Sequence, residues 1–149
     1  MNPFLLLDRR ACLSVMVGLG TSNMQAQGRS DAPESALSAE LRGKNWSSQG
    51  IHLEVPPLAD TGNAVPLAMN IDAPPGLSIE QVEVLLPENP NPMALRLQWP
   101  SGTRQVNFQT RLRLAATQSV WVIARYSDGS QCARSAPTII TSTACLDGT

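Results

Sequence analysis

From Ile51 onward apolar and polar residues alternate along the chain, and this period of two constrains the fold more than any other feature. Successive side chains of a strand point to opposite faces of its sheet, so the alternation predicts strands that bury one face. In the clearest run, Val106 to Leu114, the arginines Arg111 and Arg113 fall on the polar face. We expect them to form a solvated face, with an anion-binding or partner-binding surface as the alternative. Further strands are predicted around residues 51–55, 65–71, 82–86, 95–99, 120–126 and 131–142.

Turn-forming residues separate these runs at short intervals. Asp128-Gly129 stands between two alternating runs, and this dipeptide predicts a tight hairpin. Seven short strands with turns at this spacing predict an all-β fold, a seven-stranded antiparallel immunoglobulin-like β-sandwich over residues 49–142. The other turn signals are Pro56-Pro57, Thr61-Gly62-Asn63, Pro74-Pro75-Gly76, Asn89-Pro90-Asn91-Pro92 and Ser101-Gly102.

Residues 1–26 have the features of an export signal peptide. Arg9-Arg10 provides a charged start, and the apolar run 11–20 is too short to span a bilayer, which needs roughly 20 residues. The arginine pair also fits a twin-arginine signal, so this route and general secretion both stay open. Cys12 does not follow a completed apolar run, so we expect no lipid or membrane anchor. Cleavage after Ala26 would leave a periplasmic protein in an oxidising compartment.

Residues 27–48 are predicted to form a short helix and a linker. The helix is expected from Ser30 to Gly43, because Ser30 or Asp31 can cap its start and glycine can close its end. Leu37 and Leu41 lie four residues apart and give this helix a narrow apolar stripe.

Trp121 and Ile123 occupy the outward positions of an otherwise apolar strand. Either the helix or loops cover these two side chains, or they form a surface for a partner. The sequence leaves both readings open.

Charge and composition exclude several classes of function. The chain has 11 Lys and Arg residues against 12 Asp and Glu residues, so it lacks the excess of basic residues that is typical of a nucleic-acid-binding protein. The single histidine, His52, is expected on a solvated face, and Met69 and Met93 are expected in the core rather than in a copper site. Because no set of residues suggests catalysis, metal binding or a cofactor, we expect a protein that is not an enzyme.

The mature chain would keep two cysteines, Cys132 and Cys145, which lie 13 residues apart. Along one extended strand and tail their Cα atoms would be roughly 40 Å apart, whereas a disulfide needs about 7 Å. We therefore expect no bridge between them. Cys132 is expected to be structural or incidental, and Cys145 lies on a small, polar C-terminal segment, residues 143–149, where a thiol is accessible to oxidation.

The order of several of these segments resembles the SoxY family, the sulfur-carrying subunit of bacterial thiosulfate oxidation. The segment from Ile51 to Leu67 looks like the opening strands of the family, and Asn89-Pro90-Asn91-Pro92 looks like its central loop. Thr110 to Ala115 and Ser127 to Ser130 are similar to a later strand and hairpin, and a cysteine follows on a C-terminal arm. The resemblance covers about residues 46–145.

The resemblance implies a carrier without a catalytic site of its own. Cys145 corresponds to the cysteine that receives a sulfur compound oxidatively, and the arm then presents this cargo to periplasmic redox and hydrolytic enzymes. The arm residues around Cys145 are Thr143, Ala144, Leu146, Asp147 and Gly148. The resemblance also implies a heterodimer with a small β-sandwich subunit of the SoxZ type.

The arm departs from the family pattern, in which glycines surround the cysteine. Here Ala144 precedes Cys145, while Leu146 and Asp147 follow it and add bulk and negative charge. This departure indicates a divergent paralogue within the family. The alternative function is therefore a non-carrying interaction or assembly module of another periplasmic oxidation system, such as that of a quinoprotein dehydrogenase.

Overall fold

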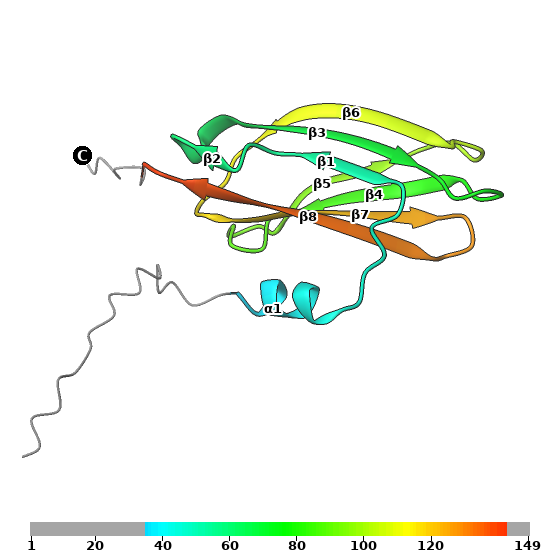
Figure 1. Cartoon of the computed structure of the whole chain (residues 1–149), viewed down its shortest axis with the longest axis horizontal. Coiled ribbons are helices and arrows are strands. Elements are labelled where there is room, and N and C mark those ends of the chain that lie inside the picture. The colour runs from blue at the N-terminus through cyan, green and yellow to red at the C-terminus, as the bar shows by residue number, and fades with distance from the viewer. Residues whose placement is uncertain (1–34, 143–149) are drawn as a thin grey trace, which may run out of the picture. The chain divides into compact units, whose positions relative to one another are not determined.

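Two β-sheets face each other across one apolar core in the computed structural model, which describes residues 35–142 (Figure 1). The first sheet has three strands in the order β1-β3-β6, and the second has five in the order β2-β8-β7-β4-β5. The first sheet consists of β1 (Ile51–Glu54), β3 (Val65–Asp72) and β6 (Gln105–Leu112). The second consists of β2 (Leu58–Ala59), β4 (Ile79–Leu85), β5 (Met93–Gln98), β7 (Gln118–Tyr126) and β8 (Gln131–Ile140).

The prediction of an all-β sandwich is confirmed, with one addition. The structure contains the two-residue strand β2 between β1 and β3, which pairs with β8 in the parallel sense. The other strand pairs are antiparallel. β2 has two residues and lies between Pro56-Pro57 and a loop that contains Gly62. A strand this short shows no alternation of apolar and polar residues, so the sequence pattern could not reveal it.

The alternation in the sequence determines which side chains fill the core. In β3 the residues Val65, Leu67, Met69 and Ile71 are at most 1% exposed, while the intervening side chains point outward. In β6 the polar residues at 107, 109 and 111 are exposed, as the period of two predicted. His52 is exposed on β1, whereas Met93 is 40% exposed and does not belong to the core, contrary to expectation.

The turn between β7 and β8 is the tight hairpin that Asp128-Gly129 predicted. Gly129 has a φ of 82°, a left-handed conformation that glycine adopts without strain, and its N–H donates to the Tyr126 carbonyl at 2.9 Å. The backbone N–H and the hydroxyl of Ser130 both donate to the Asp128 carboxylate. These hydrogen bonds hold the pKa of Asp128 below its ordinary value, because they favour the charged carboxylate.

The helix α1 (Ala36–Gly43) begins later than the sequence predicted and ends at the predicted glycine. Its N-cap is Ser35, not Ser30 or Asp31, and the Ser35 hydroxyl accepts from the Ser38 N–H at 3.2 Å. The same hydroxyl donates to the Glu88 carboxylate at 3.0 Å, which fixes the start of the helix to the loop after β4. The contact with Glu88 favours Ser35 as the N-cap. Local capping preferences could not predict it, because Glu88 is distant in the sequence.

The helix packs on the outer face of the five-stranded sheet and decides between the two readings of Trp121 and Ile123. Leu41 is buried against both side chains, and the indole N–H of Trp46 donates to the Leu41 carbonyl at 2.9 Å. The helix and the linker that follows it therefore cover this apolar surface, so it is not a free partner site. The full cluster consists of Leu41, Leu85, Trp121, Ile123 and Ala133, with Leu37 and Trp46 partly buried against it. Between residues 35 and 142 no helix is long and apolar enough to cross a membrane.

Candidate functional site at the start of the C-terminal arm

The predicted cargo residue Cys145 and its neighbours Thr143, Ala144, Leu146, Asp147 and Gly148 lie outside the described residues. The structure therefore describes the base of the arm, which is the end of β8. The strand itself ends at Ile140, two residues before its predicted end.

Backbone hydrogen bonds from the segment around β2 hold this end of β8 beyond the last strand residue. The N–H of Ile139 donates to the Pro57 carbonyl at 2.9 Å, and the N–H of Thr141 donates to the Ala59 carbonyl at 3.0 Å. Ser142 continues the pattern, because its N–H donates to the Asp60 carbonyl at 2.9 Å. The base of the arm is thus fixed to the sandwich up to Ser142.

The opposite side of β8 is held as well. The backbone N–H of Ile140 donates to the hydroxyl of Thr117, in the loop before β7, at 2.9 Å. Cys145 follows Ser142 by three residues, so covalent geometry keeps its Cα within roughly 10 Å of the anchored Ser142.

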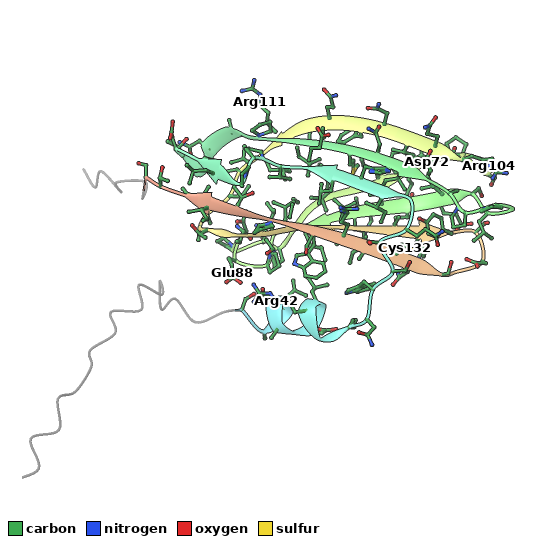
Figure 2. All side chains as sticks on the ribbon, viewed as in Figure 1. Arg42, Asp72, Glu88, Arg104, Arg111 and Cys132 are labelled. Carbon is green, nitrogen blue, oxygen red and sulfur yellow. The ribbon has the colours of Figure 1, made fainter. Side chains whose placement is uncertain are left out.

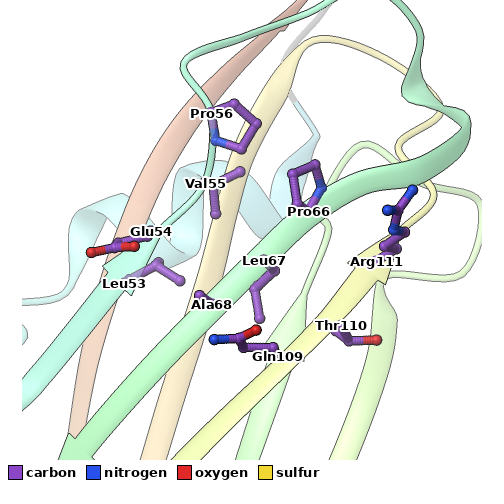
Figure 3. A pocket seen from close by; sticks show the side chains of 10 residues that line it. All are labelled: Leu53, Glu54, Val55, Pro56, Pro66, Leu67, Ala68, Gln109, Thr110 and Arg111. Carbon is purple, nitrogen blue, oxygen red and sulfur yellow. The ribbon is translucent and has the colours of Figure 1, made fainter.

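A pocket of about 810 Å³ opens beside this end of the molecule, on the three-stranded sheet (Figure 3). It exists because β1 pairs with β3 only as far as Glu54 opposite Ala68, while β3 continues to Val65. The chain turns away at Pro56, which leaves that stretch of β3 without a neighbour on this side. The lining residues are Leu53, Glu54, Val55, Pro56, Pro66, Leu67, Ala68, Gln109, Thr110 and Arg111.

The pocket carries one positive and one negative side chain on opposite sides (Figure 3). Arg111 lies on β6 opposite Pro66, and Glu54 lies on β1 opposite Ala68, so the two charges are separated by the strand β3. Both residues are exposed, and the side chain of Arg111 makes no hydrogen bond or ion pair with residues 35–142. The sequence predicted an outward Arg111, but the early end of β1 that creates the pocket was not predicted.

Cys132 lies near the start of β8, at the opposite end of the strand from Ile140 (Figure 2). It is half-buried, unpaired among residues 35–142, and ten residues before Ser142, which corresponds to roughly 33 Å along an extended strand. Its thiol lies beside the hydroxyl of Tyr126. This placement supports a structural role for Cys132 within the sandwich.

Tyr126 is fully buried, and its hydroxyl makes no hydrogen bond of ordinary geometry with the described residues. Burial, and then the neighbouring Cys132 thiol, raise the pKa of Tyr126 to about 12, because both disfavour the phenolate. Its ordinary value is about 10.

Since the chain has one tyrosine, its ultraviolet phenolate absorbance is expected to titrate with a midpoint near pH 12 in the folded protein. The folded pKa is raised, so this residue's contribution to stability is fully present below about pH 10 and is lost as the pH rises toward 12. Tyr126→Phe should remove this pH dependence from urea unfolding curves. A midpoint near pH 10 while circular dichroism still reports the fold would contradict the burial of this hydroxyl.

Residues 35–142 contain no cluster of three or more His, Cys, Asp or Glu side chains that could hold a metal ion. Arg113 is exposed, like Arg111, and the carbonyl of Arg113 accepts from the Asn89 side chain at 2.7 Å. At this end of the molecule the structure describes the anchored base of the arm and the pocket beside it.

The model of one protein family, described as "Sulfur oxidation protein SoxY", matches residues 38–145 of the chain. No protein with curated annotation matches the sequence. Among solved structures, the sulfur carrier protein SoxY from Chlorobium limicola f thiosulfatophilum is similar in fold, with a TM-score of 0.51 and 19% identity. That similarity covers 62% of this chain and 76% of the other.

Superoxide reductase structures match with lower TM-scores. The neelaredoxin of Ignicoccus hospitalis has a TM-score of 0.47 and 15% identity, over 62% of this chain and 80% of its own. A putative superoxide reductase from Thermotoga maritima has a TM-score of 0.47 and 9% identity, over 64% and 89% of the two chains. Nothing about the chemistry of this chain follows from similarities at that level.

Proposed function

Because this chain belongs to the SoxY family of sulfur oxidation proteins, we propose that it is a sulfur carrier that holds its cargo on the thiol of Cys145. The observation that carries the proposal is the extent of the family match, which runs from residue 38 to residue 145 and so ends on this cysteine. In this proposal the chain supplies the attachment point for the cargo, and partner enzymes carry out the chemistry.

The proposed loading step joins the Cys145 thiolate to a sulfur anion such as thiosulfate. One S–S bond forms, and the two reactants together give up two electrons to a partner redox enzyme, so charge and electrons balance. The reactive form is the thiolate, and its access to the partner decides the rate. Hydrolytic partners would then act on the bound sulfur compound.

The anchored end of β8 supports this division of labour. A carrier must present a mobile thiol to more than one enzyme and keep a body that those enzymes recognise. Cys145 follows Ser142 by three residues, which reach at most roughly 10 Å when extended. The hydrogen bonds at Thr141 and Ser142 give that reach a fixed origin.

The proposal includes the setting in which the carrier works. Residues 1–26 act as an export signal, and the mature protein acts in the periplasm. There it pairs with a small β-sandwich subunit of the SoxZ type and meets redox and hydrolytic enzymes of sulfur oxidation.

A second candidate function follows from the residues after the cysteine. Leu146 and Asp147 stand where the family has glycines, and a narrow tunnel shaped for glycine would exclude them. The chain would then be an interaction or assembly module of another periplasmic oxidation system and would carry no cargo.

An add-back experiment tests the proposed function. Partner enzymes of sulfur oxidation, prepared without this chain, are given thiosulfate, and the electrons that they pass to a cytochrome are measured. Addition of the wild-type chain with its SoxZ-type subunit is expected to restore electron transfer. No response to the added chain would contradict the role in sulfur oxidation.

A further inference from the structure

We propose that a second pocket, between the linker after α1 and the start of β8, binds a small oxyanion. The linker runs past the start of β8 (Figure 1), and the backbone N–H of Ala133 donates to the Ser47 carbonyl of the linker at 2.9 Å. The pocket beside this contact has a volume of about 450 Å³, which is sufficient for a small ligand. The inference goes beyond the proposed function, because it needs neither Cys145 nor a cargo.

The charges around this pocket favour an anion. Its lining contains two cationic side chains, Lys44 and Arg134, and no acidic one. The Nη1 group of Arg134 donates to the Ile51 carbonyl at 3.0 Å, which orients the guanidinium and leaves its other N–H groups without a partner among residues 35–142. Lys44 is shared with Glu40, whose carboxylate lies 3.0 Å from the Lys44 Nζ, so Arg134 supplies the main charge of the site.

β8 adds a backbone donor that no neighbouring strand uses. The N–H groups of Ala133 and Ile139 point away from β7, and the alternation along an antiparallel strand gives the N–H of Ser135 the same direction. The linker bonds to β8 at Ala133 and β2 pairs with it from Ile139 onward, so no described backbone group meets the Ser135 N–H between them. Since both ends of this gap are closed and Pro137 has no N–H, the gap suits a small ligand better than an added strand.

Further donors line the same pocket. The hydroxyls of Ser47 and Ser135 can each donate a hydrogen bond. Trp121 is 6% exposed and also lines the pocket, and its indole N–H is buried without a hydrogen-bond partner among the described residues. Buried polar groups are usually satisfied, so an unpaired donor in the lining of a cationic pocket points to an acceptor supplied from outside the chain. An oxyanion brings several acceptors on one small group.

The test follows the binding of sodium sulfate to the full chain by ¹H–¹⁵N NMR spectroscopy, at an ionic strength that sodium chloride holds constant. Sulfate is the probe because it stays fully charged across the neutral range of pH. The amide signal of Ser135 and the indole signal of Trp121 are expected to shift together along one saturable curve. The indole of Trp99 packs against the main core and serves as the internal reference, so its signal should not move.

Arg134→Gln is expected to weaken sulfate binding about tenfold, the effect of losing one hydrogen bond between charged groups. Arg134→Lys keeps the charge and should weaken it less. Arg111→Gln is the matched control, because it changes the net charge equally while Arg111 lies on β6 of the other sheet (Figure 2). The affinity for sulfate should be unchanged in this control.

Ser135→Pro tests the backbone donor by itself. Proline removes the N–H, and this edge of β8 tolerates proline because Pro137 occupies the next position whose backbone nitrogen points the same way. With the Trp121 indole signal as the readout, Ser135→Pro is expected to weaken sulfate binding more than Ser135→Ala, which removes the hydroxyl alone. Equal affinities in these two variants would contradict the role of the Ser135 N–H.

Sodium propanesulfonate distinguishes a free inorganic ion from the anionic group of a larger molecule. Tighter binding than that of sulfate would assign the pocket to an organic anion whose apolar part lies against Trp46, which lines the pocket. Weaker binding would assign it to a free oxyanion. The absence of saturable shifts with both probes, or equal weakening by Arg134→Gln and Arg111→Gln, would overturn the proposed site.

Discussion

Replacing Cys145 with serine is expected to abolish electron transfer in the add-back experiment, down to the level measured without the chain. Serine has nearly the same size and keeps the arm intact, but its hydroxyl does not ionise near neutral pH and forms no S–S bond. The proposed loading step needs that bond, so no partial activity should remain.

Cys132→Ser is the matched control for this experiment. Cys132 lies roughly 33 Å along β8 from the base of the arm, and its thiol faces the buried Tyr126 hydroxyl. Electron transfer should therefore persist in Cys132→Ser protein that is still folded. If Cys145→Ser supported wild-type transfer, the proposal that Cys145 carries the cargo would be contradicted, and the chain would act in sulfur oxidation without carrying sulfur on this residue.

Trp121→Ala is expected to lower the free energy of unfolding by about 3 kcal/mol, near the lower end of the range for large-to-small changes in a core. Trp121 is 6% exposed and packs between the sheet and α1, so its removal opens a cavity under the helix. Its indole N–H is buried without a hydrogen-bond partner in residues 35–142, and the loss of that unsatisfied donor offsets part of the cost. Urea unfolding measured by far-ultraviolet circular dichroism gives the value.

Trp121→Phe separates packing from hydrogen bonding at this site. Phenylalanine keeps most of the apolar contact with Leu41 and Ile123 and removes the unpaired N–H, so the expected cost is below about 1.5 kcal/mol. A Trp121→Ala protein of unchanged stability would mean that the helix does not cover this face. The apolar surface at Trp121 and Ile123 would then return to being a candidate partner site.

The sandwich was predictable because period-two alternation and turn chemistry agree along the whole domain. β3 shows this best, since each of its alternate apolar residues is buried as the pattern required. The hairpin at Asp128-Gly129 was predictable for a local reason, the left-handed conformation that glycine supplies.

Features that depend on contacts distant in the sequence were not predictable in this way. The helix starts at Ala36 because the Ser35 hydroxyl contacts Glu88, which lies 53 residues away. β2 forms because its backbone meets the end of β8, and the pocket forms because β1 ends before β3 does. Residue propensity and hydrophobic periodicity are local properties, so they predict neither the helix-cap contact nor these strand pairings.

For the candidate site as well, some features could be predicted from the sequence and others required the fold. The family resemblance and the arm cysteine were available from the sequence, and the family match confirms the resemblance. The anchoring of Ser142 and the apolar walls around Arg111 required the fold. The role of Cys145 stays a prediction, since it lies outside the described residues.

The most direct test of the central proposal is the intact mass of the chain purified from the periplasm of cells that are oxidising a sulfur compound. The account predicts mature protein with added masses of sulfur-containing groups, which peptide mapping assigns to Cys145 and which reducing agent removes. These added masses should be absent from the Cys145→Ala variant and present in Cys132→Ser. A Cys145 that is found only as a free thiol, or only in a disulfide between two protein chains, would contradict the proposal that this cysteine carries sulfur.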